Sequence, residues 1–294
     1  WRARARHSWD HKAHPFSPFG TKKLILLDSA NGVGPVNVTL PGPIDGGPFV
    51  GTMKGVILRR LPGARIVDLT HEAQVHWPAE AGFWVARSYH YFPSGTVHLA
   101  VVDPGVGTDR NILLALADGD AFLAPDNGLL AELIERAQAV VRHVPREVID
   151  RVRLADTSAT FHGRDIFAPL AAGLASGSLL PEELGEPTTD YVPSLIEPPV
   201  RGAAELAGVV ITTDHFGNLI TNIAREDLAH LRHPRVHAGG HDIAFHRTYG
   251  DVAPGELLAL VNSFGVLEIA RAEHSAAACL GIGPGAPVRV SEAD

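Results

Sequence analysis

The sequence predicts an α/β fold: a larger N-terminal α/β sandwich with a mostly parallel central sheet, and a smaller C-terminal all-β domain. Apolar strand patterns alternate with helical patterns up to about residue 180, which is typical of parallel βαβ units. A Pro-rich stretch then interrupts the pattern. Beyond it, short strand patterns recur at intervals of about 8–12 residues, as in a small barrel or sandwich.

The composition restricts the class of partner. The net charge of −8 argues against a nucleic-acid partner, because phosphates require clustered Lys and Arg. No apolar run approaches the roughly 20 residues of a membrane span, so we expect no membrane partner. Cys279 is the single cysteine, which excludes an internal disulfide and a cysteine-based zinc site. We therefore expect a cytoplasmic protein.

Domain boundaries follow from the composition. Residues 1–21 are basic and Pro-interrupted without an apolar core, so we expect a flexible tail rather than an intact signal peptide. His7, His11 and His14 are better explained by that tail than by a metal site. We expect an α/β domain over 22–185, a Pro-rich linker over 186–202 and a β domain over 203–294.

The elements of the α/β domain alternate in order. We expect strands at Lys22–Asp28 and Ala64–Leu69 and one that starts at Val97, with a hairpin of 112–117 and 121–124 across 118–120. We expect helices at Phe49–Leu61, Pro78–Phe92, Leu129–Val141 and Ile166–Leu174. Residues 29–48 hold too many Gly and Pro for a regular helix and are expected to form a long loop.

The elements of the β domain are seven short strands: 205–212, 218–222, 236–238, 242–245, 257–262, 266–270 and 287–291. Several histidines lie among them, and their spacing matches no metal template. These are His230, His233, His237, His241 and His246. We therefore expect scattered surface histidines and no metal site.

The stretch from Val97 to Arg110 is the best candidate for a functional site. Its apolar first half predicts a buried strand, which Pro104 ends because it lacks an amide N–H. Asp103 therefore sits at the carboxyl end of a central strand, where open α/β sheets bind ligands. The alternative is a strand-ending turn with Asp103 as its cap.

A second candidate precedes the helix at Ile166. His162 lies just before that helix, where free N–H groups favour negative charge. A structural histidine is the alternative. Together with Asp103 and Arg110, it gives three polar groups on loops beside predicted strand ends or helix starts. Asn127 follows another predicted strand and could equally be a helix cap.

Five motifs then appear in a familiar order. They are 101–107 (Val-Val-Asp-Pro-Gly-Val-Gly) with Arg110, 124–130 (Ala-Pro-Asp-Asn-Gly-Leu-Leu), 161–165 (Phe-His-Gly-Arg-Asp), 214–223 (Asp-His-Phe-Gly-Asn-Leu-Ile-Thr-Asn-Ile), and 262–265 (Asn-Ser-Phe-Gly) with 268–270 (Glu-Ile-Ala). The chain thereby resembles the S-adenosyl-L-methionine (SAM) hydroxide adenosyltransferases, or SAM hydrolases, from about Lys23 to Val290. This family is related to the fluorinase and the chlorinase.

The resemblance implies an α/β N-terminal domain, a β-barrel C-terminal domain and a homotrimer with active sites between subunits. It also implies one reaction without a cofactor, in which water or hydroxide attacks C5′ of SAM and releases adenosine and L-methionine. The family's catalytic set matches Asp103, Arg110 and His162. Either Asp103 or His162 can accept the proton, and Arg110 can hold the carboxylate or a developing hydroxide.

The resemblance also implies substrate contacts. Asp28 matches the acid for the ribose hydroxyls, and Asp214 matches the acid for the methionine ammonium. Phe216 and Asn218 match the adenine pocket, and Ser263 matches a donor to the methionine carboxylate. Asn127 and Phe264 complete the substrate-binding set that the motifs imply. The alternatives are local, since Asp214 and Asn218 also suit a β-turn and Ser263 a hairpin end.

The first loop departs from the family pattern. The family reads Thr-Asp-Phe-Gly with a second acid close behind, whereas here Asp28 is followed by Ser29-Ala30 and an inserted stretch. Asp45 either replaces the lost acid or is only a turn residue. The loop over 29–48 therefore leaves two further interpretations open, an altered substrate and a lid.

Two other functions stay open from the sequence. A halogenase that forms 5′-halo-5′-deoxyadenosine is disfavoured by the Asp103, Arg110 and His162 set. It is also disfavoured by the missing loop after Pro93-Ser94-Gly95, although a chlorinase lacks that loop too. A non-catalytic adenosine- or SAM-binding protein would have no use for a water-activating set.

Overall fold

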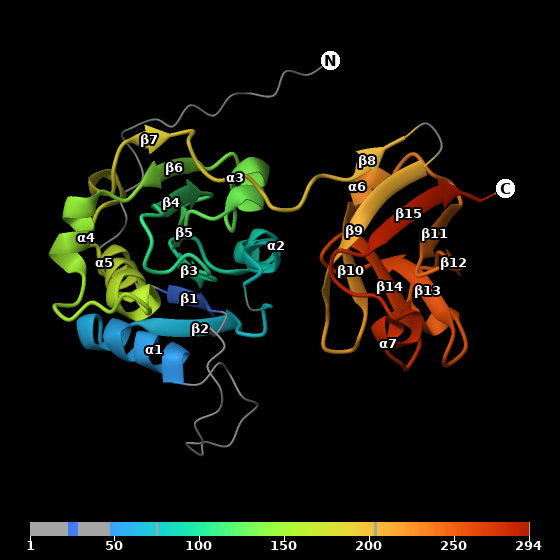
Figure 1. Ribbon diagram of the computed structural model, residues 1–294, viewed down its shortest axis with the longest axis horizontal. Coiled ribbons are helices and arrows are strands. Elements are labelled where there is room, and N and C mark those ends of the chain that lie inside the picture. The colour runs from blue at the N-terminus through green and yellow to red at the C-terminus, as the bar shows by residue number, and fades with distance from the viewer. Residues whose placement is uncertain (1–22, 29–47, 75, 203–204, 294) are drawn as a thin grey trace. The chain divides into compact units, whose positions relative to one another are not determined.

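The computed structural model describes residues 23–28, 48–74, 76–202 and 205–293. The predicted tail, Asp45 and most of the predicted 29–48 loop lie outside these ranges. The chain divides into two compact units, each with its own sheet (Figure 1). The first unit holds the described parts of 1–76 with 89–127 and 133–191, and the second holds 77–88, 128–132 and the described residues from 192 onward. The predicted α/β class is confirmed.

The first unit contains a seven-stranded sheet in the order β2-β1-β3-β5-β4-β6-β7. The strands are β1 (Lys23–Asp28), β2 (Arg65–Thr70), β3 (Val97–Val101), β4 (Ile112–Ala117), β5 (Asp120–Pro125), β6 (Val140–His143) and β7 (Pro187–Thr188). The sheet is mixed: β2, β1, β3 and β5 run parallel, whereas the pairs β5–β4, β4–β6 and β6–β7 are antiparallel. The carboxyl ends of the four parallel strands therefore share one edge.

Helices cover one face of this sheet. They are α1 (Pro48–Arg60), α4 (Arg146–Val152) and α5 (Ala168–Ser176), and α1 and α5 pack on each other (Figure 1). Val97, Leu99 and Val101 of β3 point into the shared core with Met53 and Ile57 of α1 because alternate residues of a strand face one side. The strand that leads to Asp103 is thus fixed by a buried apolar core.

Local chemistry explains where the predicted elements hold and where they change. The hairpin of β4 and β5 is confirmed, with Asp118 at φ 52° and Gly119 at φ 86° in its turn. The predicted helix Leu129–Val141 is wrong beyond its middle, since α3 covers only Ala131–Ala137. Gln138 takes φ 51°, which ends the helix, and Val140 starts strand β6 instead.

Two other helices also differ at their ends. α2 covers Pro78–Ser88 and is followed by the 3₁₀ turn η1 (Tyr89–Tyr91), where one longer helix was predicted. The predicted helix at Ile166 begins earlier, as a π-helical turn η2 (Gly163–Phe167) that continues into α5. π-turns are rare and occur often at functional sites. This one starts directly after His162.

The second unit is a nearly closed antiparallel barrel of eight strands. Its order is β12-β11-β15-β9-β10-β14-β13, with β8 paired to β9, and the bridge Phe245–Ala259 brings β12 and β13 together. The strands are β8 (Val200–Arg201), β9 (Glu205–Thr213), β10 (Leu219–Ala224), β11 (Pro234–Ala238), β12 (His241–Ala244), β13 (Leu257–Val261), β14 (Val266–Arg271) and β15 (Pro287–Glu292). The predicted C-terminal barrel is confirmed.

The remaining elements are short. They are η3 (Pro181–Glu183), α6 (Arg225–Leu228), η4 (Tyr249–Asp251) and α7 (Ala276–Leu280). The stretch expected as a linker carries β7 of the first sheet and β8 of the second. Within the second unit, α2 packs on the barrel, where Thr212 Oγ1 donates to Glu80 Oε1 at 2.5 Å. In the described ranges, no helix combines the length and apolar character needed to cross a membrane.

Candidate active site

Asp103, Arg110 and His162 form one cluster in the first unit. Arg110 Nε donates to Asp103 Oδ1 at 2.7 Å, and its Nη2 donates to Asp103 Oδ2. The same Nη2 lies 3.4 Å from His162 Nδ1. The side chains of Asp103 and Arg110 are 4% and 10% exposed, so the ion pair is largely shielded from water. The three side chains therefore lie together, although as many as 59 positions separate them along the chain.

The loop from Asp103 to Arg110 is held by its own hydrogen bonds. Val106 N donates to the Asp103 carbonyl at 3.2 Å, and Thr108 Oγ1 donates to the Gly105 carbonyl at 2.7 Å. Gly107 adopts φ 83°, a conformation that favours glycine. This tight loop returns the chain so that Arg110 faces the acid seven residues before it.

The protonation state of His162 follows from its surroundings. Burial lowers the pKa of this imidazole below its ordinary value, and the positive charge of Arg110 lowers it further. The carboxylates of Asp103 and Asp165 act in the opposite direction but do not outweigh these effects. His162 is therefore neutral near pH 7, and its Nδ1 can accept a hydrogen bond from Arg110.

We expect activity to fall in acid with a midpoint below the ordinary imidazole value of 6.5. Protonation of His162 would place a second cation 3.4 Å from Arg110 Nη2 and end that contact. Because the pKa is lowered, the neutral form persists to lower pH. A kcat/KM profile between about pH 4.5 and 9 checks this. A midpoint of the acidic limb at or above pH 6.5 contradicts this expectation. If the acidic limb of the profile survives in H162A, it belongs to a titrating group other than His162.

Two other predicted residues lie at the same sheet edge. Asn127 follows β5, and its Nδ2 donates to the Val102 carbonyl at 2.8 Å, next to Asp103. Asp28 is the last residue of β1 and is in register with Val101 of β3. The structure therefore brings Asn127 and the backbone of Asp28 to the edge that carries Asp103, while Asp45 lies outside the described residues.

The other predicted residues line one pocket in the second unit. This pocket has a volume of about 690 Å³, within the range of small-molecule sites. Asp214, Phe216 and Asn218 reach it from the β9–β10 turn, and Ser263 and Phe264 from the β13–β14 turn. All five predicted residues of the barrel thus meet at one cavity.

Aromatic rings form much of that pocket. Trp84 of α2 meets Phe264 edge to face, with ring centroids 5.1 Å apart. Phe216 is 76% exposed, which is unusual for a phenylalanine in a folded domain. Such rings offer stacking surfaces for a flat ligand.

Asp214 also has a structural task. Its Oδ1 accepts from Phe216 N at 2.9 Å and Asn218 N at 2.8 Å, and its Oδ2 accepts from Asn218 Nδ2 at 3.0 Å. The β-turn interpretation of Asp214 and Asn218 is therefore present in the structure. Both side chains still line the pocket, so their role toward a ligand stays a prediction.

Three further pocket residues, Tyr249, Asn262 and Glu268, form a hydrogen-bonded network that was not predicted. Tyr249 donates to Glu268 Oε1 at 2.6 Å, and Asn262 Nδ2 donates to Glu268 Oε2 at 3.1 Å. Burial raises the pKa of Glu268 despite these two donors, and burial with the Glu268 contact raises the pKa of Tyr249. Asn262 Oδ1 in turn accepts from Phe264 N at 3.0 Å, which fixes the loop that carries Ser263. An acid at a buried position of strand β14 was the sequence signal for this network.

The first cluster can activate water, because it combines a carboxylate and a neutral imidazole as proton acceptors with a fixed guanidinium. The barrel pocket can hold a flat ligand with polar edges. The fold and these two groups define an α/β enzyme with a C-terminal barrel. Among the described residues, no group of three or more His, Cys, Asp or Glu side chains is arranged to hold a metal ion.

Comparisons with known proteins agree with this class. The profile of the SAM hydroxide adenosyltransferase N-terminal domain matches residues 45–185, and that of the C-terminal domain matches residues 208–289. The chain therefore belongs to the SAM hydroxide adenosyltransferase family.

Individual relatives point the same way. A Thermus thermophilus protein named (R)-S-adenosyl-L-methionine hydrolase is 39% identical over 83% of this chain and 94% of its own length. A fluorinase of Actinoplanes sp. (strain N902-109) is 30% identical over 76% of this chain and 86% of its own. A crystal structure of an uncharacterized conserved protein from Thermotoga maritima has a TM-score of 0.77 at 32% identity, over 92% of this chain and 100% of that one. The hydrolase relative is thus more similar in sequence than this fluorinase.

Proposed function

We propose that this enzyme hydrolyses SAM to adenosine and L-methionine. The observation that carries the proposal is the contact of Arg110 with both Asp103 and His162. These three residues form a cluster able to activate water in a member of this family. The similarity to proteins named (R)-S-adenosyl-L-methionine hydrolase supports the same substrate.

The chemistry of the cluster fits this reaction. A water oxygen forms a bond to C5′ while the C5′–S⁺ bond breaks, and the sulfonium leaves with its electron pair as neutral methionine. The water loses one proton, which passes to Asp103 or His162, and the other stays on the 5′-hydroxyl of adenosine. Arg110 holds the carboxylate and faces the imidazole, so both acceptors keep fixed positions.

We propose that no cofactor takes part, because a sulfonium is already an activated leaving group. We also propose a homotrimer with sites at subunit interfaces, which rests on the family resemblance, and a cytoplasmic location, which rests on the single Cys279. Light scattering during size-exclusion chromatography measures the molar mass and so tests the trimer. The mass of a monomer or dimer at working concentration contradicts the proposal.

Halogenation is the second candidate, and it is supported by the fluorinase relative. Two observations weigh against it. The cluster contains a proton acceptor for water, for which a halide has no need. In addition, η1 ends at Tyr91 and β3 begins at Val97, so only residues 92–96 stand where the fluorinase carries an extra loop.

Chromatography of a reaction with SAM tests the proposal. We expect adenosine and L-methionine in equal amounts, with and without prior dialysis against EDTA. Parallel reactions with chloride or fluoride should give no halogenated nucleoside. A halogenated product would favour the second candidate, and calorimetric binding of SAM without any product over hours would favour a binding protein.

A further inference from the structure

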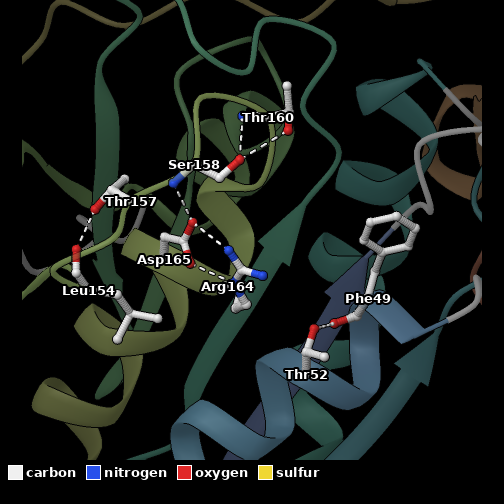
Figure 2. A network of polar contacts seen from close by, with 8 residues as sticks. All are labelled: Phe49, Thr52, Leu154, Thr157, Ser158, Thr160, Arg164 and Asp165. Carbon is white, nitrogen blue, oxygen red and sulfur yellow. Dashed lines mark hydrogen bonds and ion pairs between the residues drawn. The ribbon is translucent and has the colours of Figure 1, made fainter.

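Asp165 lies next to the proposed catalytic cluster without belonging to it. It is fully buried, within the π-helical turn that begins one residue after His162. Its Oδ1 accepts from Arg164 Nε at 2.6 Å, and its Oδ2 accepts from Arg164 Nη2 at 2.9 Å and from Ser158 N at 2.7 Å (Figure 2). A buried carboxylate held by three donors is a rigid anchor.

The ionised state of Asp165 is stabilised by these partners. Burial alone raises the pKa of a carboxyl group, but the hydrogen bonds from Arg164 and Ser158 outweigh it and lower the pKa of Asp165. Its backbone is bound as well, since the Asp165 carbonyl accepts from Leu154 N at 2.9 Å and its N donates to the Phe161 carbonyl at 3.2 Å. Asp165 therefore joins the π-turn to the segment 154–160.

That segment is a closed, hydrogen-bonded loop. Thr157 Oγ1 donates to the Leu154 carbonyl at 2.5 Å, and Thr160 N donates to Ser158 Oγ at 3.2 Å (Figure 2). Ala159 lies between Ser158 and Thr160 in this loop. With both ends fixed to their neighbours and Ser158 N fixed to Asp165, the position of Ala159 depends on the carboxylate.

Ala159 in turn contacts the loop that carries Asp103 and Arg110. A Cβ added at Gly107 would lie 2.5 Å from the Ala159 carbonyl oxygen, closer than any real contact. The two loops are therefore packed backbone to backbone at Gly107. A shift of Ala159 must move Gly107, which lies between the catalytic acid and the guanidinium.

We propose that Asp165 is the positioning residue for this cluster. It fixes the position of His162 through the π-turn. It fixes the positions of Asp103 and Arg110 through the 157–160 loop and Gly107. The inference rests on the proposed function of the cluster. Asp165 is not itself a catalytic residue, because its carboxylate is engaged by Arg164 and Ser158.

The variant D165N tests this inference. An amide cannot accept from all three donors, so the loop should shift. Misplacement of about 1 Å in a catalytic set can cost about 10²-fold, so we expect kcat to fall by about that factor. KM for SAM should stay within about threefold, because the predicted contacts to adenine and to the methionine part of SAM lie in the barrel pocket. A purely structural role would lower the amount of folded protein, without a fall in the kcat of the folded fraction at nearly unchanged KM.

E183Q is the matched control. Glu183 also accepts from a backbone N–H, Leu180 N at 2.8 Å, and from an arginine, Arg151 Nη2 at 3.4 Å. It lies in the same unit but outside the cluster. We expect unchanged kcat in E183Q, with folding of both variants checked by circular dichroism. A folded D165N with kcat within twofold of wild type overturns the inference.

Two further measurements keep the test decisive. If D165N does not fold, G107A tests the contact between Ala159 and Gly107, because the added Cβ would displace Ala159. A wild-type kcat in G107A also overturns the inference. If wild type forms no adenosine, the proposed function fails, and a crystal structure of D165N still tests the positioning. We then expect the 3.4 Å distance from Arg110 Nη2 to His162 Nδ1 to exceed 4 Å, and an unchanged distance overturns the inference.

Discussion

D103N is expected to form adenosine from SAM about 10³-fold more slowly than wild type while it keeps the fold. The substitution preserves the shape of the side chain but removes its charge and one of the two acceptors that hold Arg110. A positioned proton acceptor contributes about 10²–10⁴-fold to a rate, which sets the size of the loss. Single-turnover measurement with saturating SAM reports the chemical step directly.

H162A separates the two possible proton acceptors. If His162 takes the proton, H162A should lose a similar factor and also lose the acidic limb of the pH profile. If Asp103 takes the proton, H162A should lose a smaller factor in rate and should keep an acidic limb of the pH profile at lower pH. D190N, an exposed acid of the same unit, is the control with unchanged turnover. Wild-type turnover in D103N would remove Asp103 from the mechanism.

Much of the fold could be predicted because it follows from local rules. Pro104 limits how far β3 can extend, and the strand ends before it at Val101. The Asp118-Gly119-Asp120 turn closes the β4–β5 hairpin. The errors lie where tertiary pairing outweighs periodicity. Val140 and Val141 fit a helical pattern, yet Gln138 ends the helix and the two valines pair with β4.

The candidate site shows the same division. Each member of the cluster could be nominated by its place at a strand end or before a helix, but their proximity could not be derived from that. His162 and Arg110 are brought together by a π-turn and by the packing of Ala159 on Gly107, and neither leaves a periodic signal. Glu268 was missed for the opposite reason, because a lone acid within an apolar strand signals burial but not its partners.

R110M is expected to give the largest loss of stability among single substitutions in the cluster. It leaves the Asp103 carboxylate buried without its guanidinium, and removal of one partner from a buried ion pair costs about 3–5 kcal/mol. The centroid of the Phe167 ring lies 5.3 Å from the guanidinium carbon. We expect a methionine at position 110 to keep apolar contact with this ring, so lost packing should be a small part of the effect. For a unit of this size, the lower end of that cost lowers Tm by about 6–12 °C.

Calorimetry on wild type and three variants isolates the cause. R151M removes an exposed arginine whose partner Glu183 lies 3.4 Å away, and such a pair contributes less than about 1 kcal/mol, so its Tm should barely move. The double variant D103N/R110M removes both charges and should recover part of the loss seen in R110M, because no isolated charge is left buried. If R110M unfolds at the wild-type temperature, the Asp103 carboxylate is not shielded as the structure describes, and the electrostatic basis of the proposed mechanism fails with it.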